Sequence, residues 1–244
     1  MNKLSRRKLI TTGLGATAGV SGLAVAGGLA DRYGLIPPDC GGVYGAGHSL
    51  TYATHRLLTH NSMAREFSRS QISTPFPNGR PPQEEDFRRL EAGMFTDWRV
   101  AIDGMVTRPA SFSLADIRRY PSSSQITQLT CEEGWSFIAE WIGAPLYNVL
   151  NAAGILPQAR YVVYFSFQRR WWNSIDMADA LHPQTLLTYG MNGGDLPVPH
   201  GGPLRLRVPR QLGYKNVKYI TRLTVTDSLK EFTRKSSYSW YAGI

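Results

Sequence analysis

A strand-like segment leads directly into a cysteine in Gln125-Ile126-Thr127-Gln128-Leu129-Thr130-Cys131-Glu132-Glu133-Gly134-Trp135-Ser136. A polar turn that contains Gly134 follows the cysteine, so we expect the thiol at the end of a rigid element, where reactive groups are often held. The other cysteine, Cys40, lies in a segment rich in Gly and Pro. Cys131 is therefore the thiol that we expect inside the folded core, and it is the first candidate functional residue.

The residues alone leave four interpretations of Cys131 open. It can form a disulfide with Cys40, remain an ordinary buried thiol, or act as a nucleophile with His182 or His200 as its base. It can also supply a thiolate to a soft transition metal. That last interpretation requires a cofactor with further sulfur ligands, because the chain has no paired-cysteine or paired-histidine spacing.

The first 30 residues have the pattern of a twin-arginine export signal. Arg6 and Arg7 precede an apolar run rich in Gly and Ala, and Ala24-Val25-Ala26 offers a cleavage site. We expect a periplasmic or otherwise exported protein, and an uncleaved membrane anchor is the alternative.

The first 30 residues carry four basic side chains and no acid, so their removal lowers the net charge from +9 to +5. This excess favours an anionic cofactor or substrate, and without a basic helix or an aromatic RNA-binding motif we expect no nucleic-acid binding.

Local patterns predict a mixed α+β fold with short helices. Residues 31–82 are rich in Gly and Pro and predict an extended lead-in, and residues 83–244 form the expected catalytic domain. A capping box from Ser113 to Asp116 predicts one helix, and Pro145 and Gly154 bound another over residues 146–153. A third short helix is expected over residues 176–181. Alternating or β-branched residues predict strands at 97–104, 161–167, 185–191, 204–208 and 219–226.

Two other segments place basic residues beside glycines or aromatic residues. Residues 199–218 combine several glycines with Arg205, Lys215 and Lys218, which could bind a phosphate or could form a solvated basic edge. Gln168-Arg169-Arg170-Trp171-Trp172-Asn173 is expected to be a loop. It could line the mouth of a pocket or belong to an ordinary surface.

Four blocks of sequence, taken together, resemble the sulfite oxidase superfamily of molybdopterin enzymes. The resemblance covers residues 97–244 and is greatest to the exported bacterial branch that contains the catalytic subunit of methionine-sulfoxide reductase. The blocks follow the order found in that superfamily. They are Cys131–Ser136 with Trp141-Ile142-Gly143, Asp179–Leu187, His200–Arg205 and Gly213–Lys218.

The resemblance implies a sulfite-oxidase-type molybdopterin-binding fold with mixed sheets. It also implies that Cys131 is the protein ligand of molybdenum in a pyranopterin cofactor, which supplies two further sulfurs. Other cofactor-binding residues are carried over by their positions in the matching blocks. They are Ser166, His200 and Arg205, the backbone and side chains of Asn216, Val217 and Lys218 around the pterin phosphate, and Arg65 and Glu66 in a cofactor-contacting segment of the lead-in.

The implied activity is oxygen-atom transfer to or from a small molecule, with reduction of sulfoxide-like substrates as the leading expectation. Sulfite oxidation or dehydrogenation is the alternative, because His200 matches the sulfite oxidase form of its block. Another alternative is a non-catalytic binding protein that has lost the metal, since Glu132 replaces the valine usual after the cysteine and Arg65 replaces a tyrosine. The chain has no Cys-x-x-Cys-His haem motif, so we expect a separate electron-transfer partner, either a membrane haem protein or a soluble cytochrome.

Overall fold

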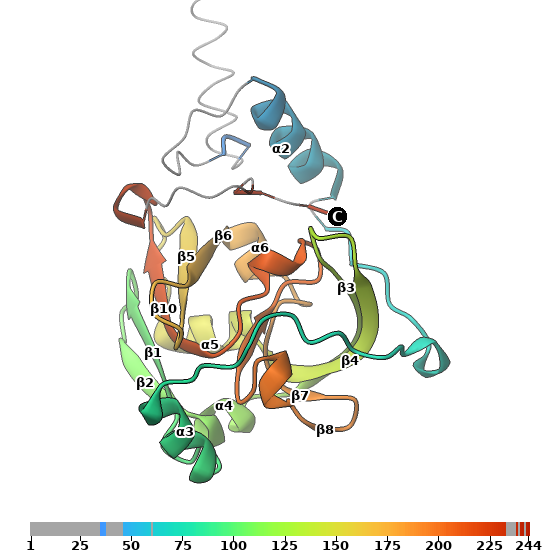
Figure 1. Cartoon of the computed structure of the whole chain (residues 1–244). Helices are drawn as coiled ribbons and strands as arrows, with labels where there is room; N and C mark the ends of the chain where they lie inside the picture. The colour runs from blue at the N-terminus through green and yellow to red at the C-terminus, as the bar shows by residue number, and fades with distance from the viewer. Residues whose placement is uncertain (1–34, 38–45, 60, 233–237, 239, 242) are drawn as a thin grey trace, which may run out of the picture. The chain divides into compact units, whose positions relative to one another are not determined.

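The computed structural model describes residues 35–37, 46–59, 61–232, 238, 240, 241, 243 and 244. The chain divides into two compact units, Met1–His60 and Asn61–Ile244, and the second unit contains both sheets (Figure 1). The expected export signal and Cys40 lie outside the described residues. No helix in the described ranges is both long and apolar enough to cross a lipid bilayer.

The first unit contains helix α2 (Ala46–Thr59), so the expectation of an extended lead-in is wrong over these residues. The helical segment has a single glycine, Gly47, and no proline, and it includes good helix formers such as Leu50 and Leu57. Residues 61–82 belong to the same compact unit as residues 83–244. The boundary that we expected at residue 82 therefore differs from the observed division after His60.

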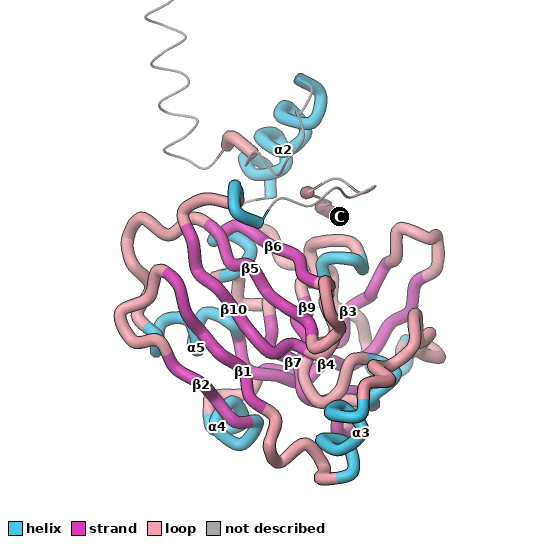
Figure 2. Tube along the Cα trace, turned by 60° about the vertical axis from the view of Figure 1, so that its left-hand side comes forward, coloured by secondary structure: helices cyan, strands magenta, loops and turns pink. Residues whose placement is uncertain are grey.

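One sheet of the second unit has five strands in the order β2-β1-β10-β5-β6, which lie side by side in Figure 2. Its strands are β1 (Arg99–Gly104), β2 (Ala110–Ser113), β5 (Tyr161–Ser166), β6 (Trp172–Asp176) and β10 (Ile220–Thr226). β1 and β10 pair in parallel, and the other neighbours are antiparallel. On β1, buried Val100 and Ile102 alternate with more exposed residues, as a strand with one covered face requires.

The other sheet carries Cys131 at the end of one of its strands. Its strands are β3 (Ser123–Thr130), β4 (Ser136–Pro145), β7 (Leu186–Met191), β8 (Gly194–Asp195) and β9 (Arg205–Arg207). β3 and β4 form an antiparallel hairpin, β4 pairs with β7, and both β8 and β9 pair with β7. The expected strands at 185–191 and 204–208 are confirmed as β7 and β9.

The helices of the second unit are short, and most of them connect strands. They are α3 (Glu85–Ala92), α4 (Leu114–Arg119), α5 (Leu146–Ala153), α6 (Met177–Ala180), and the 3₁₀ turns η1 (Arg69–Gln71), η2 (Val198–His200), η3 (Gly213–Lys215) and η4 (Lys230–Phe232). The capping box predicted at Ser113 and Asp116 is confirmed, and Gly154 ends α5 in the left-handed conformation at φ 76°. The mixed α+β prediction is confirmed. The loop expected over 168–173 is wrong at its end, because Trp172 and Asn173 pair with β5 as part of β6.

The main core lies between the two sheets and includes residues of both. Val162 and Leu223 come from the five-stranded sheet, Ala144 and Leu206 come from the sheet of Cys131, and all four are completely buried. A smaller apolar cluster lies beside Cys131. It consists of Leu129, Phe137, Ala139, Trp141, Met191 and Leu196. This second cluster gives the cysteine a rigid apolar support.

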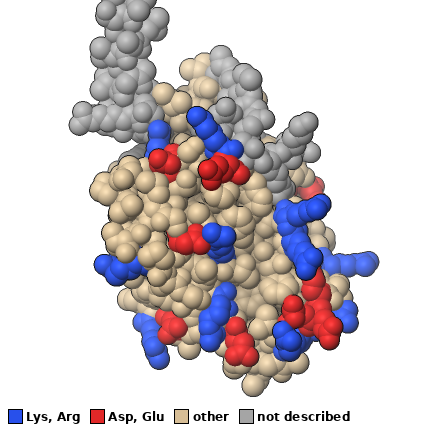
Figure 3. Space-filling view, turned by 90° about the vertical axis from the view of Figure 1, so that its left-hand side faces the viewer, with Lys and Arg blue, Asp and Glu red and all other residues tan. Residues whose placement is uncertain are grey.

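On the face of the molecule shown in Figure 3, basic and acidic side chains are interspersed. In the exposed ion pairs of the second unit, Arg222 pairs with Asp103 at 2.7 Å and Arg118 pairs with Asp195 at 2.7 Å. Such pairs typically contribute about 0–1 kcal/mol each.

Candidate active site

Cys131 is the first residue of the tight loop that joins β3 to β4. Its N–H donates to the carbonyl of Trp135 at 2.9 Å, and its own carbonyl accepts from the N–H of Gly134 at 3.2 Å. Gly134 has a φ of +93°, a conformation that glycine adopts without strain. These contacts close the loop directly after the last strand pair, Thr130 with Ser136, so the backbone at Cys131 is fixed by the hairpin.

The thiol of Cys131 opens onto a cavity of about 320 Å³, which we call the Cys131 cavity. Its lining comes from the loop 76–80, the β3–β4 loop and the residues around His200 and Lys218. The lining residues are Phe76, Asn78, Gly79, Arg80, Leu129, Cys131, Glu132, Glu133, Trp135, Phe137, Gln168, Trp171, His200, Arg205, Gly213, Tyr214, Asn216, Val217, Lys218, Tyr219 and Tyr238. A Cβ atom added to Gly213 would lie 3.3 Å from the Cα of Cys131, so the loop 213–218 packs closely against the cysteine.

The environment of Cys131 favours a protonated thiol in the cofactor-free protein. Burial, with a further contribution from the charges of Glu132 and Glu133, raises the pKa of Cys131 to about 11. The Sγ atom donates to Oε2 of Glu132 at 3.4 Å. Cys131 is a free, buried thiol, so the disulfide interpretation is not supported.

The two histidines considered as bases do not form a nucleophile pair with Cys131. His182 does not line the Cys131 cavity, and its Nε2 lies 3.2 Å from the carbonyl oxygen of Ser62. His200 does line the cavity. Burial, followed by the charges of Arg205 and Lys218, lowers the pKa of His200 to about 4, so the ring is neutral at pH 7. A thiol with a raised pKa and no imidazole partner is poorly suited to nucleophilic catalysis.

Two cations of the Cys131 cavity, Arg205 and Lys218, form no ion pair with a carboxylate among the residues that the structure describes. Arg205 is 4% exposed and donates to the carbonyls of His200 and Asn216, each at 2.7 Å. Its Nε atom has no hydrogen-bond partner in the part of the chain that the structure describes. Lys218 donates to the carbonyls of Pro199, at 2.6 Å, and Asn78. Burial lowers the pKa of Arg205 to about 10, and burial with the Arg205 charge lowers the pKa of Lys218 to about 7.

This donor set fits a molybdopterin cofactor. A single thiol in an apolar setting suits a soft metal whose other sulfur ligands come from the cofactor. The unpartnered Nε of Arg205 and the depressed pKa of Lys218 both indicate a place where an anion would relieve buried positive charge. Gly201, at φ +108°, leaves room between these cations, because a Cβ there would lie 2.9 Å from the Lys218 side chain.

Six of the nine expected site residues line the Cys131 cavity. They are Cys131, His200, Arg205, Asn216, Val217 and Lys218. The side-chain amide of Asn216 is already occupied, since its oxygen accepts from Arg207 and from the N–H of Val208, both at 2.7 Å, and its nitrogen donates to Leu212. Asn216 therefore contributes backbone to the cavity, whereas we expected its side chain to contribute as well.

The structure does not place Arg65, Glu66 or Ser166 in the cavity lining. Glu66 pairs with Thr127 along the outer edge of β3, and its carboxylate accepts from Gln184 at 3.1 Å. The guanidinium of Arg65 lies 4.8 Å from the centre of the Phe67 ring. Ser166 accepts from the N–H of Gln168 at 3.1 Å. The segment 65–67 thus covers the edge of the sheet and does not reach the cavity.

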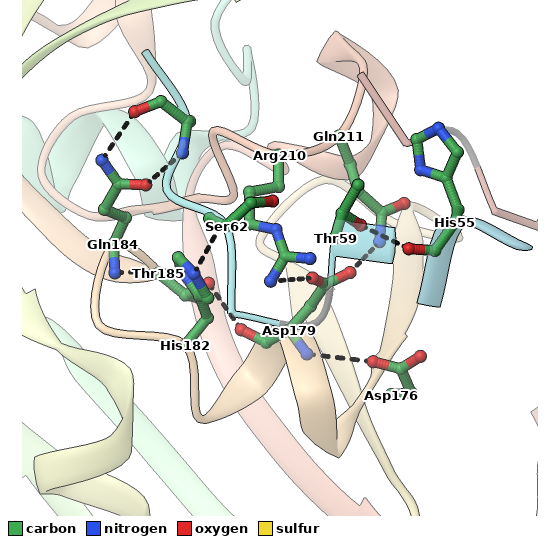
Figure 4. A network of polar contacts seen from close by, with 11 residues as sticks. His55, Thr59, Ser62, Asp176, Asp179, His182, Gln184, Thr185, Arg210 and Gln211 are labelled. Atoms are coloured by element: carbon green, nitrogen blue, oxygen red, sulfur yellow. Dashed lines mark hydrogen bonds and ion pairs between the residues drawn. The ribbon is translucent and has the colours of Figure 1, made fainter. Parts of the chain in front are cut away.

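Buried polar contacts hold this segment in place (Figure 4). Gln184 accepts from the N–H of Ala64 at 2.7 Å and donates to the carbonyl of Ala64 at 3.1 Å. Close by, Asp179 forms a buried ion pair with Arg210 at 3.7 Å and accepts from Gln211, as Figure 4 shows. The block Asp179–Leu187 therefore supports the fold around the site, and its side chains do not line the cavity.

Several lining residues were not anticipated from the sequence. Phe76, Asn78 and Arg80 belong to a segment that we described only as part of the lead-in, and its Pro and Gly content gave no indication of a site. Gln168 and Trp171 line the cavity, in agreement with one of the two interpretations of residues 168–173. The contacts that bring the loop 76–80 to the cavity are long-range, such as the one from Lys218 to the carbonyl of Asn78.

A mixed fold of two sheets, with a lone thiol at a hairpin loop facing buried cations, defines a cofactor-binding oxidoreductase of the sulfite oxidase type. The family model described as "Oxidoreductase molybdopterin binding domain" matches residues 89–233. The chain belongs to this family, within the sulfite oxidase superfamily, and is a molybdenum-cofactor-dependent oxidoreductase.

Similar proteins support this assignment. A protein of Azospira oryzae, provisionally named protein-methionine-sulfoxide reductase subunit YedZ1, is 37% identical over 188 residues, which cover 77% of this chain and 70% of that protein. The protein-methionine-sulfoxide reductase catalytic subunit MsrP of Ralstonia nicotianae is 31% identical over 166 residues, 60% of this chain and half of that protein. The crystal structure of the sulfane dehydrogenase SoxCD from Paracoccus pantotrophus matches with a TM-score of 0.52 and 26% identity, over 55% of this chain and 39% of that one. The expected fold family is confirmed.

Proposed function

We propose that the protein reduces sulfoxides by oxygen-atom transfer at a molybdenum cofactor held in the Cys131 cavity. The observation that carries the proposal is the single buried thiol facing Arg205 and Lys218, two cations with no carboxylate partner in the described chain. The names of the Azospira and Ralstonia relatives support sulfoxide reduction in particular. The net reaction takes two electrons and two protons, and it converts a sulfoxide into a thioether and water.

Each side of the cavity would have its own task. Cys131 would hold the metal, and Arg205, Lys218 and the backbone of residues 216–217 would hold the anionic end of the pterin. The bound cofactor supplies a metal that changes oxidation state as an oxygen atom moves to or from the substrate. Phe76 and Trp135, whose ring centres lie 4.8 Å apart, form an apolar wall that suits the alkyl groups of a sulfoxide.

A second candidate function is the oxidation of a small sulfur compound such as sulfite. The similarity to a sulfane dehydrogenase favours it, and so do the cations, which would attract an anionic substrate.

Both candidates need an electron-transfer partner, which we propose to be a separate haem protein. We also propose that residues 1–30 direct export by the twin-arginine route, which suits an enzyme that receives its cofactor before transport.

Metal content and turnover of the Cys131→Ser variant test the proposed function. The wild-type protein, produced with its cofactor pathway, should contain near-stoichiometric molybdenum and should reduce sulfoxides with an artificial electron donor. C131S should fold but lose turnover by at least about a thousandfold, because a serine hydroxyl is a poor ligand for a soft metal. Folded wild-type protein without molybdenum would refute the proposal, and activity with sulfite alone would favour the second candidate.

A further inference from the structure

Arg207 is completely buried at the end of β9. None of the ion pairs found among the described residues includes this guanidinium. Burial, followed by the charge of Arg205, holds the pKa of Arg207 well below its usual range. Burying a cation without a carboxylate partner is unfavourable, so a fold that needed only an apolar residue here would be more stable with one.

The guanidinium of Arg207 joins two segments that are distant in the sequence. One terminal nitrogen donates to Oδ1 of Asn216 at 2.7 Å. The other donates to Oγ1 of Thr127 at 3.2 Å and to the carbonyl of Gln128 at 2.5 Å. The plane of the group lies against Trp141, at 5.2 Å from the ring centre. Arg207 therefore links the end of β3 to the loop 213–218.

Both linked segments determine where Cys131 lies. Thr127 and Gln128 are on β3, which ends one residue before Cys131. Asn216 orients the loop 213–218 through four hydrogen bonds, to Arg207, Val208, Gln211 and Leu212, and Gly213 of that loop packs against the Cα of Cys131. Lys218 belongs to the same loop, and Arg205 on β9 donates to the carbonyl of Asn216 at 2.7 Å. A shift at Arg207 would thus change the separation between the thiol and these two cations.

We propose that Arg207 is a positioning residue of the active site, which clamps β3 to the loop 213–218 and so fixes Cys131 relative to Arg205 and Lys218. The inference rests on the proposed role of Cys131 as metal ligand, and it adds a residue that does not line the cavity. The clamp depends on the planar guanidinium, which donates in two directions at once. A lysine keeps the charge but has one compact ammonium group that cannot bond to both segments in this geometry.

The test compares Arg207→Lys with wild-type protein and with Arg222→Lys, each as the full chain produced with the cofactor pathway. Arg222 is the matched control, because it is an arginine of β10 that pairs with Asp103 at the surface. R207K should lose roughly ten- to hundredfold in kcat per bound molybdenum, with KM changed less than about twofold, since small displacements of reacting groups have effects of this size. The EPR spectrum of the half-reduced metal should also shift in R207K and remain unchanged in R222K.

The EPR spectrum and kcat per metal separate positioning from folding. If R207K only melts at a lower temperature, and its metal-bound fraction has the wild-type spectrum and kcat, the proposal is wrong. If R207K binds no metal, Thr127→Val and Thr127→Ser decide. T127V removes one acceptor of the clamp and should shift the spectrum in part, T127S should not, and a T127V spectrum identical to wild type would overturn the proposal.

The same experiments distinguish failure of this inference from failure of the proposed function. Wild-type protein without molybdenum refutes the proposed function, and this inference with it. A different result refutes only the proposed role of Arg207. In that result the wild-type protein contains molybdenum, and its EPR spectrum is lost in C131S but unchanged in R207K and T127V.

Discussion

At the scale of single residues, the site combines a protonated thiol with two buried cations, and the charge of each cation is only partly compensated by its hydrogen-bond partners. Arg205 and Lys218 donate to backbone carbonyls, which are weaker partners for a cation than a carboxylate. Burial lowers the pKa of Arg205, and burial together with the charge of Arg205 lowers the pKa of Lys218; a bound anion would act in the opposite direction. The cations are thus arranged for a ligand that is itself negatively charged.

Lys218 gives a prediction for the pH dependence of anion binding. Its pKa is about 7 in the cofactor-free protein, below the usual value of 10.5 because of burial. A bound anion favours the charged amine, so binding takes up a proton above pH 7 and the affinity falls as the pH rises. We expect sulfate, whose own charge is constant in this range, to lose affinity by up to about tenfold per pH unit above pH 7.

Calorimetry on cofactor-free protein between pH 6 and 8.5 measures this dependence. His200 and Arg205 have pKa values of about 4 and 10, so neither should change its charge over most of this range. Lys218→Met should bind more weakly and lose the pH dependence, and Lys230→Met, at an exposed position, serves as the control. An affinity that stays constant with pH in the wild-type protein would contradict the assigned role of Lys218.

At the scale of elements, the contact between β1 and β10 depends on the absence of a side chain at Gly104. This residue ends β1 at a φ of +81°, and a Cβ atom added there would lie 2.1 Å from the carbonyl oxygen of Val225 on β10. Both groups in this contact belong to the backbone, so no flexible side chain could move to make room for a Cβ atom. The parallel pairing of these strands, which is central to the five-stranded sheet, therefore requires glycine.

Gly104→Ala should destabilise the protein much more than Gly193→Ala. Gly193 also has a positive φ, +84°, but has open space around it. We expect a loss of about 1 kcal/mol in the free energy of unfolding for G193A, from backbone strain, and about 3 kcal/mol or more for G104A, where the clash is added. Chemical denaturation of both variants measures the difference, and equal losses would show that β10 can move away from β1.

Sequence reasoning succeeded where the determining contacts are local. The capping box of Ser113 and Asp116 and the left-handed cap at Gly154 each depend on residues a few positions apart, so their patterns are visible in the sequence. Arg65 and Glu66 show the opposite case. Their position is set by pairing with β3, some 60 residues further along the chain, which no local pattern indicates.

The prediction of the candidate site shows the same division between local and distant contacts. Cys131 stood out because it is a thiol at the end of a strand, and the family resemblance pointed to His200, Arg205 and Lys218, which line the same cavity as Cys131. The loop 76–80 and Arg207 could not be found in this way. The role of Arg207 depends on three acceptors from two other segments, and a basic residue on a strand normally indicates a solvated position.

At the scale of the whole molecule, the proposed twin-arginine route of export requires that the site is folded before the protein is transported. The twin-arginine route carries folded proteins, and the site needs the complete second unit, since its lining extends from Phe76 to Tyr238. Replacing Arg6 and Arg7 with lysine should retain the protein in the cytoplasm, with its cofactor bound. Cell fractionation with metal analysis measures this, and unchanged export of the double variant would contradict the proposed route.

The hairpin loop that carries Cys131 also affects the timing of biogenesis. The ribosome makes Cys131 before Arg205 and Lys218, and at ~5–20 residues per second the interval is on the order of 4–17 s. During this time the nascent chain has the proposed sulfur ligand but not the groups that we propose to bind the phosphate. Under the proposed function, cofactor insertion would follow synthesis of nearly the whole catalytic unit, and a chaperone that shields the thiol until then would act on the emerging hairpin.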